Sequence, residues 1–317
     1  MKQKLKLFNK TKIKKVLILG GGISKERKIS LNTAKSVFKV LIKKYKVKIC
    51  EPNEDLIKNL NIFKPDVVFN ALHGQFGEDG YIQTILESQK FKYTHSGVLA
   101  SAIAMDKEIS KKIYIKNKIL TPKYFKFKFD DNKKIDKNII SKIQKKLNFP
   151  VVIKPINEGS SVHVYICNKK DLIKNLKKLI MYKEILIEKF IPGREIQVAI
   201  MGKKKLGLIE LKPRRKFYDY EAKYSVKAKT KHIIPVNMSV KNTTKVMNIA
   251  LRAHNLIGCR GVTRSDFKFY KNKFFILEIN TQPGMTDLSL VPEIAKYNNI
   301  SFKDLVKKMI KDASLNR

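Results

Sequence analysis

The chain has 317 residues, of which 43% are hydrophobic, and its formal net charge is +41. This length allows two or three domains with cores of their own, and the hydrophobic share excludes an intrinsically disordered chain. Only eight of the 68 basic residues are arginines, and the lysines are spread along the whole chain, which favours a composition bias over a specific nucleic-acid surface.

The cysteines and the apolar runs indicate the compartment. Cys50, Cys167 and Cys259 are far apart and form no CxxC pair, so we expect reduced thiols in a cytoplasmic protein. Residues 1–15 are basic and lack the apolar stretch of a signal peptide. No apolar run approaches the roughly 20 residues that cross a bilayer, so no membrane partner is expected.

The first region reads as the opening of a doubly wound α/β domain. A short apolar strand at 16–19 leads through three glycines into a helix over about 30–44. Strands at 47–50 and 66–70 follow, and each ends in polar residues. Ligands of such sheets bind at the carboxyl ends of the strands, so the glycine-rich, charged loop 70–80 is predicted to line a binding site.

The second region begins near Thr121-Pro122. Residues 126–146 predict a lysine-rich strand and helix with a solvated face. The buried strand 149–155 then carries Lys154, and a lysine among valines and isoleucines needs a carboxylate or an anion as its partner. Backbone N–H groups of the small polar turn 158–162 are suited to cradle a phosphate.

Further along lie one more strand and one long loop. The strand covers residues 185–190 and contains Glu188 and Lys189. The loop covers residues 212–231 and is rich in Tyr, Lys and Arg. Loops of this length in compact proteins are commonly functional, and we predict a lid.

A hairpin near the end of the chain carries three oxygen donors. Strands at 267–270 and 273–279 would bring Asp266, Glu278 and Asn280 together, and the last two face the same side of one strand. Hard oxygen donors suit Mg²⁺, whose shell is completed by water and substrate phosphates. The alternative is an ordinary hairpin with polar residues at its open end.

Together these features describe a nucleotide held between two α+β layers, and here the chain resembles the ATP-grasp superfamily and, within it, the D-alanine–D-alanine ligase family. The resemblance runs from Gly20 to about Ile294 and rests on six motifs in the same order. They occupy residues 21–27, 73–80, 104–107, 158–161, 218–224 and 278–293.

The resemblance implies an α/β and α+β fold in three parts. A Rossmann-like substrate domain would cover residues 1–105, a central ATP-grasp subdomain 106–195, and a C-terminal ATP-grasp subdomain 196–317. The implied activity is ADP-forming ligation of two D-alanines through a D-alanyl phosphate, for peptidoglycan precursors. The resemblance implies two Mg²⁺ ions, with Mn²⁺ as a substitute, and a homodimer.

On the nucleotide side, the resemblance places lysines on the phosphates of ATP, other side chains on adenine and ribose, and oxygen donors on the metal. The implied residues are Lys107, Lys154, Glu188, Lys189, Ile191 and Glu195 for ATP, and Asp266, Glu278 and Asn280 for the metal. Surface ion pairing is the alternative for Glu188 and Glu195.

On the amino-acid side, Glu26 would accept the ammonium group of the first D-alanine, with His73 beside it. A buried histidine with satisfied hydrogen bonds is the alternative for His73. Arg264 and the backbone N–H of Gly284 would stabilise the oxyanion of the tetrahedral intermediate, as fixed donors should.

The second D-alanine and the lid involve the remaining residues. Lys223, Ser289 and the backbone of Leu290 would hold the second carboxylate. Ser160 and Tyr224 would join Glu26 in a hydrogen-bonded set that closes the lid and keeps water from the acylphosphate. Similar dipeptide-forming enzymes carry tyrosine at the position of Tyr224, so the resemblance favours an amine nucleophile. A tyrosine that only packs on the body is the alternative.

Three positions depart from the family pattern. His163 stands where the family usually has glycine, so the phosphate turn needs room for a side chain and a compatible φ. His95 also replaces a usual glycine, farther from the chemistry. Lys28 adds positive charge near the first substrate.

Two other functions remain open at this point. A different ATP-grasp ligase would change Glu26, Lys223, Tyr224 or Ser289, and this chain keeps all four. A basic nucleic-acid-binding module would need lysines and aromatic residues gathered on one face, and 212–231 is the only cluster of that kind.

Overall fold

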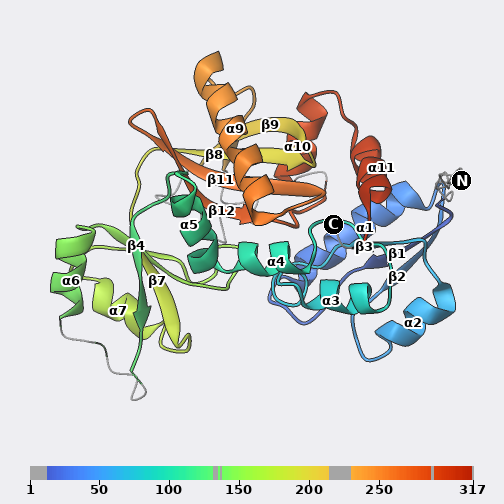
Figure 1. The fold of residues 1–317 in the computed structure, drawn as a ribbon, viewed down its shortest axis with the longest axis horizontal. Coiled ribbons are helices and arrows are strands. Elements are labelled where there is room, and N and C mark those ends of the chain that lie inside the picture. The colour runs from blue at the N-terminus through green and yellow to red at the C-terminus, as the bar shows by residue number, and fades with distance from the viewer. Residues whose placement is uncertain (1–12, 131–134, 136–137, 214–229, 287–288, 316–317) are drawn as a thin grey trace, which may run out of the picture.

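The computed structural model describes residues 13–130, 135, 138–213, 230–286 and 289–315, which form three sheets flanked by helices (Figure 1). In Figure 1 the N-terminal sheet lies at the right, the central sheet at the left, and the C-terminal sheet between and above them. Within the described ranges, no helix is long and apolar enough to span a bilayer.

The N-terminal sheet is parallel, with the order β2–β1–β3. Its strands are β1 (Lys15–Leu19), β2 (Lys46–Cys50) and β3 (Val67–Asn70). Its helices are α1 (Arg27–Leu41), α2 (Leu56–Phe63), α3 (Tyr81–Ser88) and α4 (Val98–Met105). Side chains alternate along β1, so Val16 and Ile18 pack with α1, whereas Leu17 and Leu19 pack with α2 and α3. The sheet is therefore covered on both faces, as a doubly wound domain requires.

The central sheet is antiparallel, with the order β4–β7–β5–β6. Its strands are β4 (Tyr124–Lys128), β5 (Val151–Pro155), β6 (Tyr165–Cys167) and β7 (Glu184–Lys189). Helices α6 (Ile139–Lys146) and α7 (Leu172–Lys177) pack on one face. The odd-numbered residues Val151, Ile153, Ile185 and Ile187 face these helices. Alternation turns Lys154 and Glu188 to the opposite face.

The C-terminal sheet is antiparallel, with the order β10–β9–β8–β11–β12. Its strands are β8 (Arg194–Met201), β9 (Lys204–Lys212), β10 (Lys231–Ile233), β11 (Val262–Tyr270) and β12 (Lys273–Asn280). Helices α5 (Lys107–Lys116) and α9 (Val240–Ile257) cover one face, and α10 (Leu290–Tyr297) covers the other, followed by α11 (Phe302–Asp312).

Most predicted elements are present, and the differences lie at their ends. The first helix begins at Arg27 rather than near residue 30, because the carbonyl of Glu26 already accepts the N–H of Ser30, and it ends at Leu41. Strand β11 begins at Val262, five residues before the predicted start, since it pairs with β8 as well as with β12. The predicted lid begins and ends in strands β9 and β10, and residues 214–229 lie outside the described part of the chain.

The three sheets differ in how their cores are built. One continuous core joins β1, β3 and α1 of the first sheet to β9, α10 and α11 near the end of the chain. In Figure 1, α11 accordingly lies beside α1. The central sheet has its own core, whose buried members run from Phe127 to Ile187. The N- and C-terminal parts therefore form one packed body, to which the central sheet is attached.

Candidate active site

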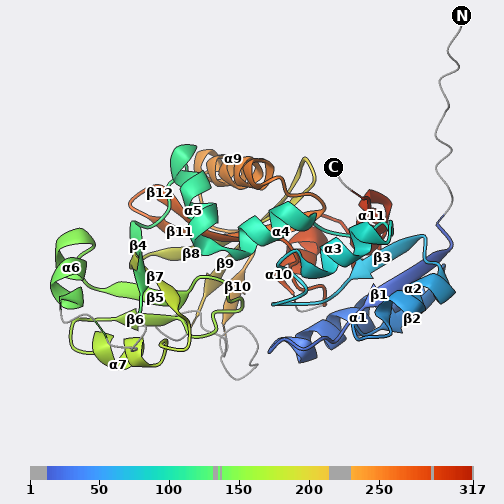
Figure 2. The same ribbon diagram turned by 60° about the horizontal axis from the view of Figure 1, so that its bottom comes forward.

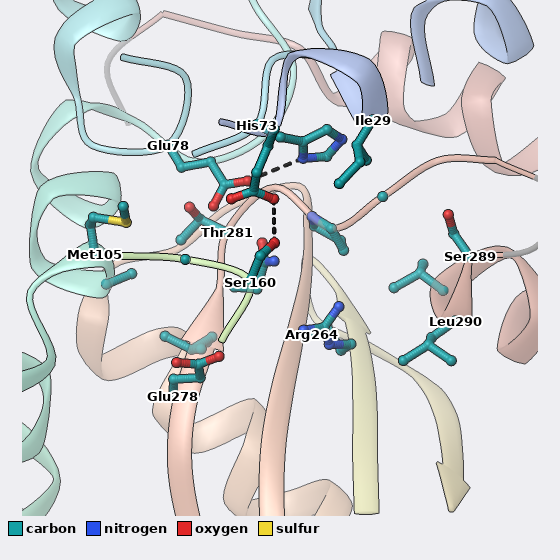
Figure 3. Close-up of a pocket in the computed structure, with 18 of the residues that line it drawn as sticks. Ile29, His73, Glu78, Met105, Ser160, Arg264, Glu278, Thr281, Ser289 and Leu290 are labelled. Atoms are coloured by element: carbon teal, nitrogen blue, oxygen red, sulfur yellow. Dashed lines mark hydrogen bonds and ion pairs between the residues drawn. The ribbon is translucent and has the colours of Figure 1, made fainter. Parts of the chain in front are cut away.

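Two adjoining cavities lie where the three sheets meet. The larger, of about 270 Å³, is bounded by Glu26, loop residues after β3 and the end of β12 (Figure 3). The smaller, of about 70 Å³, lies between the central and C-terminal sheets. Lys107, Glu158 and Glu278 line both cavities. Chemistry that links a ligand of one cavity to a ligand of the other is therefore expected near these three side chains.

The smaller cavity is built around Glu188. Lys154 on β5 donates to Glu188 Oε1 at 2.7 Å, because both side chains leave their strands on the same face. Lys111 Nζ lies 2.9 Å from Glu188 Oε2 in an ion pair, and it also donates to Thr121 Oγ1 at 2.6 Å. Both oxygens of this carboxylate, which is 3% exposed, therefore face an ammonium group.

Burial and charge act in opposite directions on these groups. Burial raises the pKa of Glu188, but Lys111 and Lys154 outweigh it, so the pKa of this carboxyl falls below its usual value. Burial lowers the pKa of Lys111 to about 8, although Glu188 raises it. Lys111 is fully buried and was not among the predicted site residues. Its spacing of four from Lys107 on one helix was the available signal, since such residues share a face.

All six predicted ATP residues line the smaller cavity: Lys107, Lys154, Glu188, Lys189, Ile191 and Glu195. Glu195 on β8 pairs with Lys268 on the neighbouring strand β11, with 2.9 Å between Nζ and Oε2. Glu188 and Glu195 both form the ion pairs of the alternative interpretation, but both are buried, so these pairs do not lie at the surface.

The hairpin brings the three predicted metal donors to one end of the C-terminal sheet. Asp266 lies opposite Glu278, and Arg264 lies opposite Asn280. Arg264 donates to both oxygens of Asp266, at 2.8 and 3.1 Å, and Glu278 Oε2 lies 3.7 Å from Lys107 Nζ. In the described ranges no three His, Cys, Asp or Glu residues cluster as metal ligands. Two carboxylates and one amide nevertheless fit Mg²⁺, which takes few protein ligands and completes its shell with water and phosphate.

Glu26 lies at the start of α1 and borders the larger cavity. The hydroxyl of Ser160, which Figure 3 labels, donates to this carboxylate, as the sequence analysis predicted. A Cβ added at Gly74 or Gly159 would come within 3.1 or 2.9 Å of Glu26 Oε1. These two glycines therefore allow two loops to approach the carboxylate closely. Lys223 and Tyr224, the predicted lid residues, lie outside the described ranges.

His73, in the loop after β3, is buried and has a partner at each ring nitrogen. Nδ1 lies 3.1 Å from Glu78 Oε1, and Nε2 lies 3.1 Å from Thr33 Oγ1 on α1. A carboxylate accepts only, so Nδ1 carries a proton. These contacts agree with the alternative interpretation, a buried histidine with satisfied hydrogen bonds. The ring nevertheless also lines the larger cavity.

A polar link that the motifs did not reveal supports the floor of the larger cavity. Asn70, at the end of β3, donates to Gln282 Oε1 at 2.7 Å, and Gln282 donates in turn to the carbonyl of Leu72. The two partners are 212 residues apart in the chain. The link fixes the loop after β12, which leads to Gly284, against the N-terminal sheet.

Gly284, Ser289 and Leu290 form the far side of the same cavity. A Cβ at Gly284 would lie 2.9 Å from Ser289 Oγ, so the glycine allows close approach of the α10 N-terminus. Ser289 Oγ accepts from the N–H of Thr286 at 3.1 Å. Figure 3 shows Ser289 and Leu290 on the same side of the cavity, apart from His73 and Glu78.

The two histidines that replace usual glycines both have positive φ, 55° for His163 and 71° for His95. His95 is buried edge-on against Phe69, and burial lowers the pKa of its ring to about 3. His95 is therefore a neutral core residue. His163 directly follows the small polar turn at 158–162, and its Nδ1 lies 2.8 Å from Tyr182 Oη. The turn thus accommodates the side chain by adopting left-handed backbone.

The fold defines the class of protein first. Two solved structures of D-alanine–D-alanine ligase from Bacillus anthracis, one of them complexed with ATP, superpose with TM-scores of 0.81 and 0.83. They are 29% and 32% identical to this chain, and each comparison covers 94% of this chain and 97% of the other. The fold is therefore that of the ATP-grasp ligases.

The sequence comparisons narrow the class to a family. A family model described as "D-ala D-ala ligase C-terminus" matches residues 114–311. A D-alanine–D-alanine ligase from Pelagibacter ubique is 70% identical over 96% of this chain and 99% of its own length. One from Zymomonas mobilis is 43% identical over 95% and 94%. The chain belongs to the D-alanine–D-alanine ligase family.

Proposed function

We propose that this enzyme uses ATP to join two D-alanines into D-alanyl-D-alanine through a D-alanyl phosphate, in the cytoplasm, for peptidoglycan precursors. The observation that carries the proposal is the junction of the two cavities at Lys107, Glu158 and Glu278. ATP in the smaller cavity would direct its γ-phosphate to this junction. The carboxylate of a D-alanine in the larger cavity would meet it there.

On the nucleotide side, Lys107 and Lys154 bind the phosphates. Glu188 orients Lys154, because the 2.7 Å hydrogen bond fixes the ammonium group at the end of its strand. Glu195 accepts the ribose hydroxyls, and Lys189 and Ile191 border the adenine together with Glu188. Positioning and charge neutralisation are the main contributions that a protein makes to phosphoryl transfer.

Asp266, Glu278 and Asn280 would hold Mg²⁺, or Mn²⁺ in its place. When bound, the metal supplies positive charge that offsets the charge on the transferred phosphoryl group. The bidentate pair with Asp266 fixes the guanidinium of Arg264 next to these donors. Arg264 and the N–H of Gly284 then stabilise the oxyanion that forms when the amine attacks the acylphosphate.

On the amino-acid side, Glu26 binds the ammonium group of the first D-alanine, and His73 supports this wall of the cavity. Ser289 and the N–H of Leu290 bind the carboxylate of the second D-alanine, with Lys223 from the predicted lid. Tyr224 and Ser160 complete the set around Glu26. The proposal also includes the three-part division at residues 105 and 195 and a homodimeric assembly.

The test measures ADP released from Mg·ATP by the purified protein, with and without D-alanine, and identifies the product by mass spectrometry. We expect ADP release that depends on D-alanine and equals the dipeptide formed. ADP without dipeptide would instead indicate another acceptor. Glu278→Gln should abolish the Mg²⁺-dependent activity, whereas Glu54→Gln, at an exposed position before α2, is the control.

A further inference from the structure

The turn between β5 and β6 contains an unusual run of left-handed residues. Ser160, Ser161 and His163 have φ values of 50°, 59° and 55°. Left-handed backbone costs free energy in residues that carry a Cβ, and β-carbon contacts are absent only in glycine. A histidine at such a position therefore needs a compensating contact of its side chain.

His163 has such a contact, and the direction of the hydrogen bonds can be assigned. Tyr182 Oη lies 2.8 Å from His163 Nδ1 and 2.9 Å from Glu158 Oε1. A carboxylate accepts only, and the tyrosine hydroxyl has one hydrogen, so Tyr182 donates to Glu158 and accepts from His163. The result is a directed chain from His163 through Tyr182, near the start of β7, to Glu158.

Glu158 in turn connects the turn to both cavities. Its backbone carbonyl accepts from Lys107 Nζ at 2.5 Å, and its Oε1 lies 3.7 Å from Lys25 Nζ. Two residues later, Ser160 donates to Glu26. The turn is thus tied to the larger cavity through Ser160 and to the central sheet through His163 and Tyr182.

We propose that His163 and Tyr182 are positioning residues that anchor the phosphate turn to the central sheet and so hold the Glu158 carbonyl on Lys107. The inference rests on the proposed function, because Lys107 is assigned to the phosphates of ATP. A glycine at position 163 would adopt a positive φ without strain, whereas His163 adopts it with its side chain hydrogen-bonded to Tyr182. Its loss should weaken nucleotide binding more than it slows turnover.

The first test is Tyr182→Phe, which removes the hydroxyl in the middle of the chain and keeps the ring. Loss of a hydrogen bond typically changes an equilibrium by about three- to tenfold, so KM for ATP should rise by about that factor. We expect kcat to change less than about twofold, and the melting temperature to stay within about 2 °C. Tyr165→Phe, on strand β6 of the same sheet with its ring under Lys178, is the matched control and should leave KM unchanged.

The second test separates anchoring from backbone strain. His163→Gly removes the strain and the donor together, whereas His163→Asn keeps an N–H donor and tolerates positive φ. Anchoring predicts that His163→Gly raises KM for ATP and that His163→Asn restores part of the loss. In the His163→Gly background, Tyr182→Phe should then add little, because the chain is already broken.

The outcomes distinguish this inference from the proposed function. A wild-type protein without D-alanine-dependent ADP release would contradict the proposed function, and ATP affinity would then be measured directly by calorimetry on the same variants. An unchanged ATP affinity in Tyr182→Phe, or an affinity in His163→Gly equal to or better than in His163→Asn, would overturn the anchor. Additive effects of the two substitutions would overturn it as well.

Discussion

Two buried glutamates, one in each cavity, are stabilised by different means. Glu188, 3% exposed, lies between the ammonium groups of Lys111 and Lys154. Glu26, 7% exposed, accepts from the Ser160 hydroxyl and is approached by the backbones of Gly74 and Gly159. The negative charge of Glu188 is compensated inside the protein framework.

The difference separates a carboxylate that holds the protein together from one suited to bind a ligand. A buried charge needs an opposite charge or strong hydrogen bonds, and Glu188 obtains both from its lysines. The carboxylate of Glu26 faces a cavity that is large enough for amino acids. We therefore expect substitutions at Glu188 to lower stability as well as ATP binding, whereas substitutions at Glu26 should affect mainly activity.

The largest expected effect is that of Glu188→Gln. The substitution leaves two buried lysines without their shared carboxylate, and breaking a buried ion pair on one side costs about 3 to 5 kcal/mol. Urea unfolding at pH 7 measures the change in the free energy of unfolding. Glu184→Gln, at the half-exposed start of the same strand, is the control and should cost less than about 1 kcal/mol. Equal losses of unfolding free energy in the two variants would show that Glu188 does not stabilise the fold through Lys111 and Lys154.

Glu26→Gln should affect activity far more than stability. Its stability should change by about 1 kcal/mol or less, whereas kcat/KM for D-alanine should fall by about a hundredfold, because a hydrogen bond between two charged groups is lost. Steady-state ADP release at varied D-alanine concentration measures the effect. Full activity of the Glu26→Gln variant would show that Glu26 does not bind the substrate. Urea unfolding of the same variant is the control for misfolding.

The cluster around Glu188 also predicts a pH dependence. The pKa of Lys111 is lowered to about 8 in the folded protein, from 10.5, so between these values the unfolded chain binds more protons than the folded protein. Stability contributed by this group therefore rises with pH in that window. From pH 7.5 to 10, wild type should gain about 2 kcal/mol relative to Lys111→Met. Relative to Lys112→Met, whose lysine is exposed on the same helix, wild type should show no such gain in urea unfolding.

The smallest expected effect concerns the hydrogen bond between the uncharged side chains of Asn70 and Gln282. Asn70→Ala leaves Gln282 Oε1 buried without its donor, which should lower the free energy of unfolding by about 1 to 2 kcal/mol. Adding Gln282→Leu removes the orphaned group as well, so the double variant should recover part of the loss. Chemical unfolding of the two single variants and the double variant measures this coupling. Additive losses would show that the two side chains do not depend on each other.

Sequence reasoning was most successful where periodicity and strand order decide the outcome. Alternation along β5 and β7 places Lys154 and Glu188 on one face, and the hairpin places Asp266 opposite Glu278. Both arrangements follow from local pattern. Their roles in binding ATP and metal remain predictions, as do those of all the assigned site residues.

For other contacts, residue spacing gave no signal that identifies the partner. The pair of Asn70 and Gln282 joins loops 212 residues apart, and Lys111 reaches Glu188 only because α5 packs beside the central sheet. Such contacts depend on how whole elements are placed, which residue spacing does not encode. At His163 the sequence showed a departure from glycine, whereas the partner that makes it tolerable, Tyr182, lies 19 residues away.

The continuous core that joins the two ends of the chain constrains the order of events during synthesis on the ribosome. Val16 and Ile18 belong to the same core cluster as residues of α1 and of α11, among them Leu305 and Met309. The first sheet therefore cannot complete its packing until nearly the whole chain has left the exit tunnel. The core of the central sheet contains only residues up to about Ile187. The central sheet can therefore fold before α11 has been synthesised and has joined the core of the N-terminal sheet.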